Sequence, residues 1–114
     1  MKEFERLAER SMPLVLAIET FVETEKRLPN ELGDLIPKYL INDPKTGMGA
    51  YPEYELVISK DGKSIDGNDW ILTVYCPLGI LNGDEFLYYP NGNYPKYGYG
   101  GYLVRVKDWA YVHE

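Results

Sequence analysis

The sequence has little of the chemistry that builds metal sites and disulfides. Its 114 residues include one cysteine, Cys76, and one histidine, His113. A lone cysteine excludes an internal disulfide and a multi-cysteine metal site, and a single histidine makes a zinc site equally hard to assemble. We therefore expect Cys76 to be a small buried side chain in a strand, and we expect neither a metal ion nor a cofactor.

Basic charge and long apolar runs are also scarce. Lys and Arg number 12 against 18 Asp and Glu, which leaves a net charge of −6 without any basic cluster. Such a surface repels phosphate backbones, so we expect no nucleic-acid partner. The most apolar run, Met12 to Ile18, is far shorter than the roughly 20 residues that cross a bilayer. Membrane attachment is expected only through an anchor that this sequence does not contain.

The first quarter of the chain has helical periodicity, which predicts a long helix over residues 2–27. One apolar stripe consists of Phe4, Leu7, Ala8, Met12, Val15, Ile18 and Val22. A second stripe at Leu14, Ala17 and Phe21 widens the apolar surface, which indicates deep burial across a sheet. Pro13 leaves two alternatives: Ser11 caps a fresh helix that has Pro13 in its first turn, or one continuous helix kinks there.

Three prolines punctuate the stretch RLPNELGDLIPKYLINDP, residues 27–44. Pro29 should end the long helix, because the residue before a proline disfavours helical geometry. Asn30 can cap a short second helix, which Pro37 should stop after about two turns. We predict that residues 30–40 form a short helical clamp that pins the end of the long helix against the core.

Residues 53–113 alternate and are rich in β-branched and aromatic side chains, which predicts four or five antiparallel strands. Helix followed by strands indicates one α+β domain over residues 1–114, with a long N-terminal helix and a short second helix packed on one antiparallel sheet. The expected core comprises Leu7, Val15, Ile18, Val22, Leu32, Leu35, Ile36, Leu56, Ile58, Ile71, Leu72, Val74, Phe86, Leu103 and Val104, with Trp70 or Trp109 partly covered.

No residue pattern predicts catalysis. His113 is a poor general base so near the chain end, and no serine has a nucleophile signature around it. Asp61, Asp66, Asn68 and Asp69 have oxygen ligands that suit calcium, but acidic residues beside glycine are also the ordinary composition of a hairpin turn. We assign no catalytic, cofactor-binding or metal-binding residue and expect a protein that is not an enzyme.

A loop rich in tyrosine and asparagine follows the third predicted strand. Side chains of these two types are favoured in binding surfaces because they offer contact area at low entropic cost. The alternative interpretation is that the rings cover the open sheet face and hold a long loop in place. The candidate partner-binding residues are Tyr89, Asn91, Asn93, Tyr94, Tyr97 and Tyr99.

One block resembles a known family. It resembles the region after the long helix in type II secretion pseudopilins and related type IV pilin-like proteins. The residues that carry the resemblance are Ala17-Ile18-Glu19, Phe21, the run Arg27 to Leu40, and Asp43-Pro44. Small envelope lipoproteins with a similar soluble domain share this sequence pattern. The resemblance covers about residues 14–58 and does not extend to residues 60–114, and the N-terminal apolar span of the family is missing.

The resemblance implies a pilin-like α+β domain of the bacterial envelope or periplasm with a structural, assembly or surface-presenting role. It also implies a protein partner or self-association. The alternative is an acidic soluble binding or immunity-type protein that recognises a partner through its surface and its tyrosine-rich loop. Cytoplasmic localisation is the corresponding expectation if Met1 is the native start.

Overall fold

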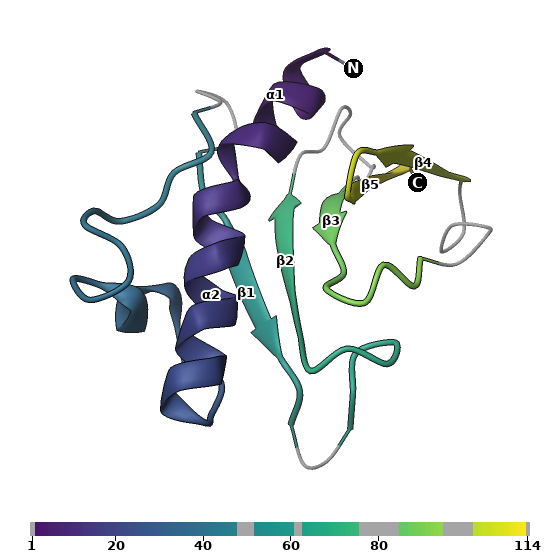
Figure 1. Cartoon of the computed structure of the whole chain (residues 1–114). Coiled ribbons are helices and arrows are strands. Elements are labelled where there is room, and N and C mark those ends of the chain that lie inside the picture. Colours follow the sequence, from purple (N-terminus) through teal and green to yellow (C-terminus); the bar gives the residue numbers. More distant parts are fainter. Residues whose placement is uncertain (1, 48–51, 61–62, 76–84, 95–101, 114) are drawn as a thin grey trace.

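Figure 1 shows the computed structural model, which describes residues 2–47, 52–60, 63–75, 85–94 and 102–113. The elements are α1 (Lys2–Arg10), α2 (Met12–Glu25), the 3-10 turn η1 (Leu32–Leu35), β1 (Glu55–Ile58), β2 (Trp70–Tyr75), β3 (Glu85–Tyr88), β4 (Tyr102–Val106) and β5 (Trp109–His113). Every strand pair is antiparallel, and the strand order is β1-β2-β3-β5-β4. The two helices cover one face of this sheet.

The predicted long helix forms and kinks at Ser11, where α1 and α2 meet at an angle (Figure 1). The helical hydrogen bonds continue through this residue, from the Ser11 N–H to the Leu7 carbonyl and from the Val15 N–H to the Ser11 carbonyl. Pro13 lies in the first turn of α2 and lacks the N–H that would continue the helical ladder. Ser11 makes no side-chain cap; its hydroxyl donates to the Leu7 carbonyl at 2.6 Å and lies 2.7 Å from the Tyr54 hydroxyl. Within the described part of the chain, neither helix is long and apolar enough to span a membrane.

The predicted second helix over residues 30–40 is wrong. This segment contains only the four-residue 3-10 turn η1, and the backbone is extended at Glu31 before it and at Ile36 after it. Asn30 caps nothing with its side chain; instead its backbone N–H donates to the Asp34 carboxylate at 2.8 Å. Because Pro37 forces the preceding residue out of helical geometry, too few residues remain to form an α-helix.

The segment after α2 is nevertheless tied to the rest of the molecule. Lys26 ends α2 in the left-handed conformation, with φ of 60° and its N–H bonded to the Val22 carbonyl. Pro29 and Leu35 are fully buried, and the Leu35 carbonyl accepts hydrogen bonds from the next turn of chain. Burial and backbone bonds therefore hold this segment in place without a second helix.

Both faces of the sheet carry buried side chains. On the helix face, α1 and α2 cover strand residues Leu56, Ile58, Trp70, Leu72, Val74, Phe86, Tyr88, Val106, Trp109 and Tyr111. On the opposite face, here called the loop face, a smaller cluster contains Val57, Ile71, Leu87, Tyr89, Leu103 and Val112, packed with Ile65 and Tyr94. Both tryptophans lie on the helix face and are buried.

The predicted core needs two corrections. Val104 lies on β4, an edge strand of the sheet, and its side chain is 38% exposed. Ile36, which was also expected in the core, is only partly buried and belongs to neither apolar cluster. Several other predicted core residues are only partly buried because they belong to the periphery of the two clusters. These are Val22, Leu32, Leu56, Ile58 and Leu103.

Candidate functional site

The structure brings together four of the six candidate partner-binding residues, just after β3. Tyr89 is 3% exposed and stacks on Tyr94, with ring centroids 4.9 Å apart. Asn91 and Asn93 are exposed beside them. Tyr97 and Tyr99 lie outside the described residues. That this surface binds a partner stays a prediction.

Asn68 is the hub that joins this loop to the hairpin after β1. Its side chain is fully buried, donates to the Asn93 side-chain oxygen at 2.9 Å and accepts from the Asn91 backbone N–H at 3.0 Å. The Asn93 amide donates in turn to the Asp66 carbonyl at 2.5 Å. Two turns with little regular ladder of their own are therefore held by reciprocal side-chain bonds.

Tyr94 links the same loop to the β4–β5 hairpin. Its hydroxyl accepts from the Tyr89 backbone N–H at 2.8 Å and donates to the Asp108 carbonyl at 2.6 Å. The Arg105 guanidinium lies 4.5 Å from the ring centroid. Burial raises the pKa of the Tyr94 hydroxyl to about 12, so this group stays a neutral donor at physiological pH. These contacts show Tyr94 in a packing role.

The acidic hairpin that offered oxygen ligands is engaged internally as well. The Asp66 carboxylate accepts a hydrogen bond from the Tyr89 hydroxyl at 2.7 Å. Asp61 lies outside the described residues. Over the ranges that the structure describes, no three His, Cys, Asp or Glu side chains are grouped so that they could hold a metal ion.

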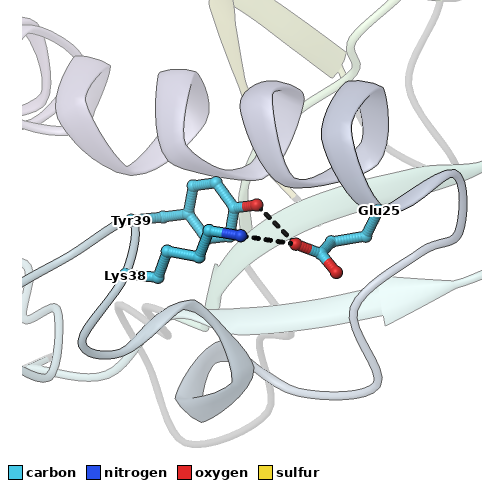
Figure 2. A network of polar contacts seen from close by, with 3 residues as sticks. All are labelled: Glu25, Lys38 and Tyr39. Atoms are coloured by element: carbon cyan, nitrogen blue, oxygen red, sulfur yellow. Dashed lines mark hydrogen bonds and ion pairs between the residues drawn. The ribbon is translucent and has the colours of Figure 1, made fainter.

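A second polar cluster joins the end of α2 to the segment after η1 (Figure 2). One oxygen of Glu25 accepts from the Tyr39 hydroxyl at 2.6 Å and from the Lys38 ammonium at 3.2 Å. The pKa of Glu25 is lowered, mainly by the hydrogen bond from Tyr39 and then by the bond from Lys38. The bond to Glu25 raises the pKa of Lys38. The cluster lies at the surface, with the Lys38 side chain exposed and Glu25 partly buried, and it links the chain after η1 to the end of α2.

A shallow groove follows the outer edge of β1. Its larger part has a volume of about 310 Å³, and the adjoining part has about 220 Å³. The larger part is lined by Asn30, Glu31, Leu32, Asp43, Glu53, Tyr54, Glu55 and Leu56. The smaller part continues along the strand and is lined by Asn30, Glu55, Leu56, Val57, Ile58 and Lys60.

Sequence reasoning missed this groove. Alternation identifies residues 53–59 as a strand, but it does not tell which strand of a sheet lies at the edge. Glu31 and Glu55 are 24 positions apart in the sequence, and only the return of the chain from η1 to β1 puts them on one groove. The signal that could have pointed to the groove was the presence of a carboxylate at both positions, since the packing of the core does not need a charged residue at either one.

The groove and the Tyr/Asn loop are thus two candidate surfaces. Comparisons of this chain with protein-family models, with curated proteins and with solved structures found no significant match.

Proposed function

We propose that this chain is a non-enzymatic, pilin-like assembly domain of the bacterial envelope, which packs through α2 against a neighbouring copy. One observation carries the proposal. On the solvent side of α2, Met12 is 42% exposed and Leu16 is 55% exposed, one helical turn apart. The other side of the same helix is already buried in the domain's own core through Leu14, Val15, Ala17, Ile18 and Phe21.

The solvent side of α2 is apolar at Met12 and Leu16 and polar further along, at Glu19 and Glu23. Exposed apolar residues beside a buried helix face are typical of a helix that has a second packing partner at that end. The sheet supplies the first partner, and a second copy of the chain supplies the other. Two side chains cover much less than the roughly 800 Å² per partner of a stable interface. We therefore expect weak association in dilute solution, which becomes effective where copies are held at high local concentration.

The resemblance of residues 14–58 to pilin-like proteins supports the same proposal, since α2 is the helix that enters the similar block. The envelope localisation rests on this resemblance alone. Fractionation of the source bacterium with an antibody to the domain tests it: envelope or periplasmic recovery supports the proposal, and recovery in the cytoplasm contradicts it.

Photo-cross-linking tests the packing of α2. A benzoylphenylalanine at position 16 should form an adduct of the chain with itself in intact cells, because Leu16 is the more exposed of the two apolar residues on the solvent side of α2. The same probe at Lys63, exposed on the hairpin beyond β1, is the matched control and should give no such adduct. Equal adducts at the two positions, or none at position 16, would contradict the proposal.

A pair of variants separates apolar packing from charge. With the photo-probe at Met12, Leu16→Lys should abolish the adduct, because it places an ammonium group in the expected contact. Thr20→Lys adds the same charge one turn further along at an exposed position and should reduce the adduct less. Thermal melting of both variants should match that of the parent, since neither side chain is part of the core.

A further inference from the structure

We propose that the outer edge of β1 is a docking site for an extended, lysine- or arginine-containing segment of another protein, which adds to the sheet as a further strand. The site is separate from the α2 surface, so it stands or falls independently of the assembly proposal. The docking site consists of the backbone of β1, and the charged side chains beside this strand favour a basic segment.

The backbone of β1 has hydrogen-bonding groups directed away from the sheet. β1 pairs with β2 only and ends the strand order. The Ser59 N–H bonds to the Asp69 carbonyl at 2.8 Å, so residues 59, 57 and 55 direct their backbone groups toward β2. By the same alternation, Leu56 and Ile58 direct theirs outward, which is the arrangement that β-strand addition requires.

The groove leaves room for a strand along these two residues. Its two adjoining parts run from Glu53 to Lys60 beside β1, and Asn30 borders both of them. Leu56 and Ile58 are only partly buried although their side chains pack at the margin of the helix-face core. An added strand would therefore gain apolar contact as well as backbone bonds.

Charge selects a basic segment. Four of the eight residues that line the larger part of the groove are carboxylates: Glu31, Asp43, Glu53 and Glu55. Lys45 engages two of them, with its ammonium 2.6 Å from Glu53 and 3.3 Å from Asp43. Among the described residues, Glu31 and Glu55 form no ion pair, so negative charge remains on both the turn side and the strand side of the groove.

A flexible segment fits this edge better than a second sheet does. Asn30 and Leu32 line the groove beside β1, and we expect this turn segment to hinder the approach of another folded sheet edge. At the other end of the sheet, β4 carries Arg105 in an exposed position, which disfavours a basic segment there. The proposal therefore commits to an extended peptide at β1.

Synthetic peptides provide the test. The probe is acetyl-Lys-Val-Lys-Val-Lys-Val-amide, and the opposite-charge control replaces each lysine by glutamate. In amide NMR spectra of the whole chain, the lysine peptide should shift Leu56 and Ile58 most strongly, and the glutamate peptide should leave them unchanged. Binding should also weaken as salt is added, because part of the attraction is between exposed charges.

N-methylated peptides isolate the backbone contribution. In an added strand, alternate residues direct their N–H groups to the neighbouring strand and the others direct theirs to solvent. Two peptides therefore form a matched pair. In one, the backbone nitrogens of all three lysines are methylated, and in the other, the backbone nitrogens of all three valines are methylated. One of the two should lose about tenfold or more in affinity, since each lost hydrogen bond is worth a factor of a few, and the other should lose much less.

Paired variants of the protein isolate the charge. Glu31→Gln with Glu55→Gln should weaken the lysine peptide by about threefold or more at low salt, while Glu19→Gln with Glu23→Gln removes equal charge from exposed positions on α2 and should have little effect. Each of three results would overturn the proposal: shifts centred away from β1, equal loss for the two methylated peptides, or a lysine-peptide affinity that ignores Glu31 and Glu55. Absence of binding, or a dimer through β1 in sedimentation runs, would do the same.

Discussion

The two faces of the sheet are buried by different means. On the helix face, α1 and α2 contribute Leu7, Leu14, Val15, Ile18 and Phe21, and aromatic rings such as Phe86 and Trp109 stack with centroids 4.8 Å apart. On the loop face, the turns around residues 63–69 and 89–94 lie over a smaller apolar cluster and are joined by side-chain hydrogen bonds. One face is held by packing, and the other combines packing with a polar network.

The difference follows from what each covering element does with its backbone. A helix satisfies its own N–H and C=O groups, so it needs only an apolar stripe to cover a sheet. Turns leave backbone groups without a ladder partner, and side chains such as Asn68 must supply those bonds. The four described tyrosines and asparagines of this loop, Tyr89, Asn91, Asn93 and Tyr94, are thus all engaged in contacts within the domain.

The largest expected effect on stability comes from shortening one buried leucine on each face of the sheet. Leu72 on the helix face is fully buried, and Leu87 on the loop face is 5% exposed. Leu72→Ala should lower the free energy of unfolding by about 3–5 kcal/mol, and Leu87→Ala by about 2–3 kcal/mol, because turns can relax into a void more easily than two helices can. Urea denaturation of both variants measures the difference; a larger loss for Leu87→Ala would break the comparison.

A smaller effect is expected from the polar hub of the loop face. Asn68→Ala leaves backbone partners in a buried site without their bonds and should cost about 1–3 kcal/mol in unfolding free energy. Asn93→Ala is the control, since Asn93 is exposed and water can replace its bonds. If chemical denaturation shows equal losses for the two variants, burial of the hub is not what stabilises these turns.

The smallest expected effect is a pH dependence of the loop face. Burial raises the pKa of Tyr94 from 10 to about 12, so the unfolded chain releases this proton before the folded chain does. The stabilisation is complete below pH 10 and is lost as the pH rises toward 12. Melting temperatures between pH 9 and pH 11 should therefore fall less steeply for Tyr94→Phe than for the parent.

Periodic apolar spacing and residue composition correctly located the N-terminal helix and the central strand. The apolar spacing of residues 4–22 predicted helix, and the strand-forming composition of residues 70–76 predicted the strand that became β2. It failed between residues 30 and 40, where Leu32, Leu35 and Ile36 have helical spacing but Pro37 leaves too short a run. Spacing records which side chains are apolar, and the proline decides how far the backbone can continue.

The candidate surfaces divided in the same way. The sequence predicted Tyr89, Asn91, Asn93 and Tyr94 in one loop. The structure shows Asn91 and Asn93 bonded to Asn68, which lies 23 and 25 positions before them. The groove at β1 was not predicted, because it depends on the strand order and on the return of residues 30–32 to the sheet edge. Contacts between residues distant in the chain leave no periodic trace in either partner.

By itself, then, the sequence determined an N-terminal helix and a series of strands, because these follow from local backbone preferences and from side-chain alternation. Tertiary structure alone decided that β5 inserts between β3 and β4, that β1 lies at an edge, and that Glu31 and Glu55 share a groove. Strand order depends on which pairings bury the most apolar surface across the whole chain, and no local stretch of sequence contains that information.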